Sequence, residues 1–135
     1  MNNSKRRFER VNCDLPVLYE FVKWKINDHE HFGNGSQAHC VDISIAGIGV
    51  NTPIPLTKRL AAQLLKGTKK IRLSITLPDK DDPEVLFARL IWSGNSKNAP
   101  SNRYGFLFID ITENQFKHLQ DYVNNSLKMN GQALS

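Results

Sequence analysis

The chain is poor in cysteine and has no long apolar run. Cys13 and Cys40 are the only cysteines among 135 residues, and their spacing matches neither a metal site nor a redox motif. We therefore expect two reduced thiols that pack inside a cytoplasmic protein. No charged start followed by an apolar stretch is visible at the N-terminus, and no segment is long and apolar enough to cross a bilayer. From these absences we expect that the protein is neither secreted nor inserted in a membrane.

Recognisable catalytic machinery is also lacking. The sequence contains no phosphate loop of the G-x-x-x-x-G-K-[ST] type and no pattern typical of a Ser/His/Asp triad. His29 and His31 lie in a stretch rich in turn formers, "NDHEHFGNGSQ", which favours a polar hairpin loop over a metal site. The segment "PDKDDP" at 78–83 lacks the glycine and the distal glutamate of a calcium loop. We expect no enzyme, no metal and no cofactor, and therefore a binding module.

Positive charge is present in excess. The formal net charge is +5, and four cations fall within the first ten residues: Lys5, Arg6, Arg7 and Arg10. A basic balance favours anionic partners such as nucleotides or nucleic acid. A solvated basic tail is the alternative, although Phe8 argues against it because a large apolar side chain gains nothing in such a tail.

Apolar periodicity predicts a mainly β fold. Alternating residues indicate about six strands, over 15–26, 38–44, 48–52, 69–78, 84–94 and 104–111. The stretch 52–68 contains two prolines and then a mildly helical run, so we expect a loop with one or two helical turns. Short strands with tight turns predict a six-stranded antiparallel β-barrel.

A helix is expected after the last strand. Thr112 and Gln115 have the spacing of a capping box, and an apolar stripe follows at helical intervals: Phe116, Leu119, Val123 and Leu127. The predicted organisation is a flexible basic arm over 1–12, a barrel with a C-terminal α-helix over 13–128, and a frayed tail over 129–135.

The motif D-x-S-x-x-G stands where the second predicted strand turns into the third. It consists of Asp42, Ser44 and Gly47, and strand alternation puts Asp42 and Ser44 on one face. Gly47 can take a positive φ or allow another group to approach the backbone closely. Taken alone, the motif favours a plain hairpin turn, because Asp and Ser bond their own backbone in turns.

The arm and this motif together resemble the PilZ domain. Arg6-x-x-x-Arg10 is followed some thirty residues later by Asp42-x-Ser-x-x-Gly47, and "RYGFLFIDIT" is similar to the Gly-hydrophobic-x-Phe strand that closes the barrel of that family. The resemblance extends from Arg6 to about Leu127. PilZ domains are bacterial receptors for the second messenger cyclic di-GMP, so the resemblance implies a non-enzymatic receptor that binds this ligand, alone or as a stacked pair.

The resemblance also implies roles for the arm. Arg6 and Arg10 would clamp guanine edges or phosphates, because an arginine fork pairs bidentately with both. Arg7 and Lys5 would add positive field. We expect the arm to be mobile without ligand, to change conformation on binding and to signal to an unidentified downstream protein.

The barrel would supply the remaining contacts. Asp42 offers acceptors to the N1 and N2 donors of guanine, Ser44 could donate to a phosphate or a base, and Gly47 would leave room for a flat ring. Trp92, at the end of "ARLIWSG", is a candidate for stacking on a guanine, with packing as an equally weighted alternative. Arg103, just before the last predicted strand, could reach the site, but a surface position is expected.

Two alternative functions remain open at this stage. A small basic barrel with surface aromatics is also typical of modules that bind single-stranded nucleic acid. The chain could also be a protein-interaction domain that has the fold without the ligand. The five positions of the two family motifs, which we call the signature residues, are all present: Arg6, Arg10, Asp42, Ser44 and Gly47. We therefore expect the ligand to be cyclic di-GMP and not a nucleic acid.

Overall fold

The structure of the chain is a computed structural model that describes residues 9–25, 35–53, 55–93 and 102–134. The chain order of the elements is β1 (Val11–Asn12), β2 (Pro16–Lys23), β3 (Ser36–Ile43), β4 (Gly47–Asn51), α1 (Lys58–Lys66), β5 (Lys69–Ile75), β6 (Glu84–Ser93), β7 (Arg103–Ile109) and α2 (Glu113–Leu134).

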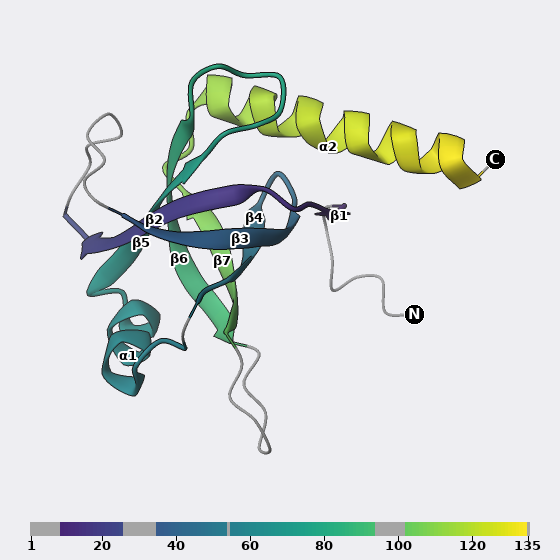
Figure 1. Cartoon of the computed structure of the whole chain (residues 1–135). Coiled ribbons are helices and arrows are strands. Elements are labelled where there is room, and N and C mark those ends of the chain that lie inside the picture. The colour runs from purple at the N-terminus through teal and green to yellow at the C-terminus, as the bar shows by residue number, and fades with distance from the viewer. Residues whose placement is uncertain (1–8, 26–34, 54, 94–101, 135) are drawn as a thin grey trace, which may run out of the picture.

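Six of the strands form a closed antiparallel barrel. The strand order is β1-β3-β2-β5-β6-β7-β4, and an additional β3–β4 pairing closes the ring. The short strand β1 pairs with β3 beyond the end of β2, so β1 and β2 occupy the same side of β3. The predicted six-stranded antiparallel barrel with a C-terminal helix is confirmed (Figure 1).

The barrel interior is filled by the alternating residues that the sequence indicated. On β5 and just after it, Ile71, Leu73, Ile75 and Leu77 are all buried, and so are Tyr104, Phe106 and Phe108 on β7. Burying each of these side chains contributes about 1.5–3 kcal/mol, which fixes the strand register because a one-residue slip would expose the whole set.

The two helices lie at opposite ends of the barrel (Figure 1). Helix α1 is longer than the predicted one or two turns: Thr57 caps its N-terminus and Gly67, with φ of 82°, ends it in the left-handed conformation. Helix α2 begins with the predicted capping box, in which Thr112 Oγ1 accepts from the Gln115 amide and Gln115 Oε1 accepts from the Thr112 amide. No helix in the described part of the chain is long and apolar enough to span a membrane.

The boundaries of the predicted arm and tail differ from the observed elements. Val11 and Asn12, at the end of the arm predicted over 1–12, belong to β1. Helix α2 continues to Leu134, through most of the tail predicted over 129–135. On its predicted stripe Leu119 and Val123 are buried, whereas Phe116 is exposed.

The expectation of two reduced thiols is wrong. Cys13 and Cys40 form a disulfide across a sequence separation of 27 residues. Their spacing along the chain carried no signal of this, because it is the antiparallel alignment of residues 11–12 with 42–43 that brings the two Cα atoms to 6.0 Å. Cys40 does pack in the core, as predicted, with 2% of its surface exposed.

Some of the predictions concern residues outside the described ranges. These residues are Lys5, Arg6, Arg7 and Phe8 of the arm and the pair His29 and His31. Their roles remain predictions.

Candidate functional site

Asp42 faces the outside of the barrel because of a bulge in β3. Cys40 pairs with Val50 and Asp42 pairs with Gly49, so Val41 is one extra residue on β3 relative to β4. Cys40 points into the core, and strict alternation would point Asp42 the same way two residues later. The bulge reverses the alternation and turns the carboxylate outward, as bulges near functional sites often do.

Trp92 is turned outward in the same way. Leu90 pairs with Phe106 and Trp92 pairs with Gly105, which makes Ile91 the extra residue on β6. Leu90 is buried in the core, so alternation alone would have sent the indole of Trp92 inside with it. Two separate bulges thus direct two predicted ligand residues onto one outer wall.

Two glycines lie between these side chains and form what we call the glycine floor, Gly49 and Gly105. The register runs from Asp42 to Gly49, from Gly49 to Gly105 and from Gly105 to Trp92. A Cβ on Gly49 would lie 2.7 Å from Asp42 Oδ1, and one on Gly105 would lie 2.0 Å from Trp92 Nε1. The Asp42 carboxylate therefore lies over Gly49, and the Trp92 indole lies over Gly105. The strands that carry Asp42 and Trp92 are three strand spacings apart, at about 4.8 Å each.

Two arginines surround the Asp42 carboxylate. Oδ2 of Asp42 lies 4.0 Å from Nη1 of Arg10 and 3.5 Å from Nη2 of Arg103. Arg10 comes from the segment just before β1, and Arg103 begins β7, so the sheet brings together cations that are far apart in the sequence. Two guanidinium groups share one carboxylate, and this leaves the cluster with a net positive charge that suits an anion.

Ser44 and Gly47 shape the turn between β3 and β4. The Ser44 hydroxyl oxygen accepts from the amides of Ala46 and Gly47, and the Ser44 amide donates to the Gly47 carbonyl. A Cβ on Gly47 would lie 2.3 Å from the Phe106 carbonyl oxygen, so this glycine permits a close approach of β7. Both residues hold the turn that follows Asp42, and the serine hydroxyl keeps one proton to donate.

The structure thus brings Arg10, Asp42 and Trp92 onto one wall and adds residues that the sequence analysis missed. Arg103 was expected at the surface rather than in the site, Gly105 was noted only as part of the closing strand, and Gly49 was not considered. The glycines of "GIGVN" and "RYGFLF" were a readable signal, because glycine inside a strand often marks the close approach of another group.

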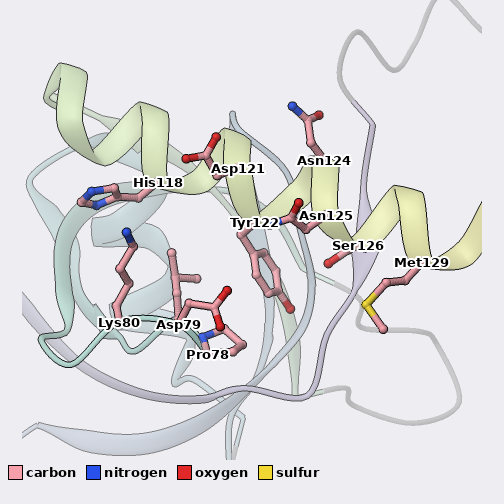
Figure 2. Close-up of a pocket in the computed structure, with 11 residues that line it drawn as sticks. Pro78, Asp79, Lys80, His118, Asp121, Tyr122, Asn124, Asn125, Ser126 and Met129 are labelled. Atoms are coloured by element: carbon pink, nitrogen blue, oxygen red, sulfur yellow. The ribbon is translucent and has the colours of Figure 1, made fainter.

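A separate cavity of about 570 Å³ lies between α2 and the loop after β5. Figure 2 shows Lys80, His118, Asp121, Tyr122 and Met129 around it. The ring nitrogen of His118 also contacts the Glu84 carboxylate, which ties α2 to β6. None of the described signature residues lines this cavity. Among the described residues there is no group of three or more His, Cys, Asp or Glu side chains that could hold a metal ion.

The family model for the PilZ domain matches residues 4–125 of the sequence. The chain belongs to the PilZ domain family. PilZ domains are ligand-binding receptor domains rather than enzymes, and the match covers both the arm and the D-x-S-x-x-G motif of this one. A search of curated proteins finds no significant match.

Solved structures of other PilZ proteins share the fold. The Bacillus subtilis inhibitor of motility MotI/DgrA aligns with a TM-score of 0.63 at 16% identity, over 92% of this chain and 52% of that one. Escherichia coli YcgR in complex with c-di-GMP aligns with a TM-score of 0.59 at 14% identity, over 96% of this chain and 48% of that one. The chain therefore spans about half the length of these two proteins.

An isolated PilZ domain matches over nearly its whole length. The PilZ domain of Escherichia coli YcgR with c-di-GMP aligns with a TM-score of 0.56 at 12% identity, covering 96% of this chain and 95% of that one. At these identities the likeness shows the fold.

Proposed function

We propose that the chain is a cytoplasmic, non-enzymatic receptor that binds cyclic di-GMP on the outer wall of its barrel. The observation that carries the proposal is the arrangement of Arg10, Arg103 and Asp42 in line with Trp92 across the glycine floor. A positively charged cluster beside an aromatic ring suits a ligand that combines phosphates with flat bases.

Each described residue has a role that its position permits. Asp42 accepts hydrogen bonds from N1 and N2 of a guanine, and Arg10 and Arg103 then pair with phosphate or with guanine N7 and O6. Trp92 stacks on a base lying over the floor. Ser44 and Gly47 hold the turn that follows Asp42, and the Ser44 hydroxyl can donate its proton to the ligand.

The arm completes the site in this proposal. Arg6 and Arg7 precede Arg10 and add charge-assisted bonds to the phosphates, whether one ligand molecule or a stacked pair is bound. Binding changes the conformation of the arm, and a downstream protein reads that change.

Titration calorimetry with cyclic di-GMP tests the proposal, with cyclic di-AMP and GMP as controls. If arginine forks and Asp42 read guanine edges, cyclic di-GMP should bind far more tightly than cyclic di-AMP, because adenine carries an amino donor where guanine has O6. Equal affinity for the two dinucleotides would contradict the guanine-reading roles. Binding that falls steeply with salt and accepts any oligonucleotide would favour a nucleic-acid module instead.

Matched arginine variants test the clamp. Arg10→Ala and Arg103→Ala should each remove one or two charge-assisted bonds and weaken cyclic di-GMP binding about ten- to a hundredfold. Arg59→Ala removes the same charge from an exposed position on α1, at the opposite end of the barrel from α2, and should leave affinity unchanged. Equal losses in all three variants would mean that overall charge, rather than the Asp42 cluster, drives binding.

A further inference from the structure

The Cys13–Cys40 disulfide joins the two segments that carry the proposed site. Cys13 lies three residues after Arg10, and Cys40 lies two residues before Asp42. The Sγ atom of Cys40 is 3.4 Å from the Asp42 carbonyl oxygen. This is a contact in the disulfide, because the sulfur has no proton, and it becomes a hydrogen bond only when Cys40 is a thiol.

The disulfide also spans the bulge that directs Asp42 outward. The Cys13 amide donates to the carbonyl oxygen of Val41, the bulged residue, at 3.0 Å, and the Cys40 amide donates to the Leu15 carbonyl oxygen at 2.9 Å. The backbone on both sides of the bulge is therefore held by residues 13–15. Whatever fixes Cys13 in place therefore also restrains the bulge that directs the Asp42 carboxylate.

Strand β1 is short. Among the described strands its two residues pair with β3, where Asn12 stands opposite Asp42 and Val11 opposite Ile43, and α2 packs against it. So short a ladder is marginal by itself, although the buried side chain of Val11 adds some anchorage. The covalent bond between Cys13 and Cys40 adds to these contacts a further constraint on the segment that positions Arg10.

The proposed cytoplasmic location bears on the role of the Cys13–Cys40 bond. In a cytoplasm that keeps thiols reduced, disulfides are rare, and those that form are usually transient and redox-sensing or catalytic. Cys13 is half-buried whereas Cys40 is buried, so an incoming thiolate has better access to the sulfur of Cys13.

We propose that the Cys13–Cys40 bond is a reversible redox site that sets the affinity of the neighbouring Asp42 cluster for its anionic ligand. This inference rests on the proposed function. The oxidised chain has Arg10 and Asp42 held in the binding geometry, and the reduced chain releases β1 and lets the bulge relax, so that it binds more weakly.

The reductant is a dithiol of low molecular weight or in a protein active site. Its thiolate attacks Cys13 Sγ, the Cys13–Cys40 bond breaks, and Cys40 leaves as a thiolate that takes a proton. The second thiol of the reductant then attacks the mixed disulfide and releases Cys13. Two electrons and two protons pass to the protein, and the dithiol becomes a disulfide.

The test is calorimetric titration of cyclic di-GMP into the oxidised chain, into the chain reduced with dithiothreitol, and into the double variant Cys13→Ala/Cys40→Ala. Thiol alkylation and mass spectrometry establish the redox state, and circular dichroism establishes that each sample is folded. We expect the reduced chain to bind about tenfold more weakly, within the 5- to 150-fold range typical of coupled sites. The double variant should have the same affinity for cyclic di-GMP as the reduced chain, and dithiothreitol should not change it.

Hydrogen exchange of the same samples separates this inference from the proposed function. Reduction should raise exchange at the Val11 to Cys13 amides and at 40–42, and leave α1 unchanged. Equal affinity of folded oxidised and reduced chains would overturn the inference, as would a chain that forms no disulfide under oxidising conditions. If neither form binds cyclic di-GMP, the proposed function fails. The exchange data then decide this inference, and identical exchange in the two redox states would overturn it.

Discussion

At the scale of single residues, the two glycines of the glycine floor have different roles: Gly105 matters for the stability of the fold, and Gly49 for the position of Asp42 in the site. A Cβ on Gly105 meets the rigid indole of Trp92 at 2.0 Å, whereas a Cβ on Gly49 meets the end of the Asp42 side chain at 2.7 Å. An indole packed on a strand cannot easily move away from an added methyl group, whereas a carboxylate can rotate away from it. The two glycines should therefore respond differently to the same added methyl group.

Gly105→Ala should destabilise the fold by about 1–3 kcal/mol, the usual cost of overpacking. Gly49→Ala should cost less stability but displace Asp42 and weaken cyclic di-GMP binding. Urea denaturation and calorimetry on both variants measure the two effects separately. A Gly49→Ala variant with normal affinity would show that the direction of Asp42 does not matter for binding.

Lys70 is an unusual cation because it is buried on the outer side of β5. Its Nζ lies 4.0 Å from the ring centroid of Phe87 and 5.6 Å from that of Trp24, and only 1% of its surface is exposed. Burial lowers the pKa of Lys70 below its ordinary value of 10.5, while Asp110 acts in the opposite direction. Its ammonium group lies over the Phe87 ring and its side chain is buried, so the residue contributes packing as well as charge.

The lowered pKa predicts a specific pH dependence. Between that pKa and 10.5 the unfolded chain holds a proton that the folded chain has released, so this group makes the free energy of unfolding rise with pH in that interval. Lys70→Met keeps an unbranched apolar side chain at this buried position and removes the titration. Denaturant unfolding just below pH 10.5 should therefore show a smaller rise than in the unchanged chain. Lys66→Met, at an exposed position on α1, is the charge-matched control, and the same slope in both variants would contradict the assignment.

At the scale of elements, regular patterns were predictable and irregular ones were not. The alternation of Ile71, Leu73 and Ile75 gave β5 directly, because a strand with one buried face must repeat every two residues. The bulges at Val41 and Ile91 left no such mark, since a bulge is defined by the register of the neighbouring strand and not by the bulged strand alone.

The candidate site was also predictable only where its residues form a local pattern in the sequence. The motif residues Asp42 and Ser44 were identified from spacing and family resemblance, but Arg103 joins Asp42 only through the pairing of β3 with β4 and of β4 with β7. The disulfide between Cys13 and Cys40 was missed for the same reason. Contacts between strands that are distant in sequence carry little local signal.

The start of α2 offers a test of how an element is joined to the barrel. Gln115 takes part in the capping box with Thr112, and its Nε2 also donates to the Val85 carbonyl oxygen of β6 at 2.8 Å. Thr112→Ala should cost about 1 kcal/mol as a lost cap, and Gln115→Ala should cost more, because it also leaves a partly buried carbonyl without this donor.

Urea denaturation measures both losses, with Gln120→Ala on an exposed position of α2 as the control. The control should change stability by no more than about 0.5 kcal/mol. If Gln115→Ala costs no more than Thr112→Ala, the bond from Gln115 to β6 adds nothing, and α2 is held by its apolar stripe and by the contact between His118 and Glu84.

At the scale of the whole molecule, the described end of the arm, from Arg10 to Asn12, meets the barrel wall beside Asp42. β1 leads the chain from Arg10 into the sheet beside Asp42, while α1 lies at the opposite end of the barrel from α2 (Figure 1). A ligand bound at the Asp42 cluster would therefore contact the end of the arm without touching α1. Any signal that arises from binding should begin on the side of the molecule where the chain enters the barrel.

This arrangement predicts which resonances respond to ligand. Lys5, Arg6, Arg7 and Arg10 repel one another, and a bound anion with several charges would replace that repulsion with charge-assisted bonds. Fixing the backbone costs about 1–2 kcal/mol per residue, so those bonds must offset the cost of any ordering in the arm. On addition of cyclic di-GMP, backbone NMR shifts should be largest at residues 4–12 and 42–47 and smallest in α1, and GMP should produce much smaller changes. If residues 42–47 shift while 4–12 stay unchanged, the ligand binds without using the arm, and the change that a downstream protein reads must arise elsewhere on the barrel.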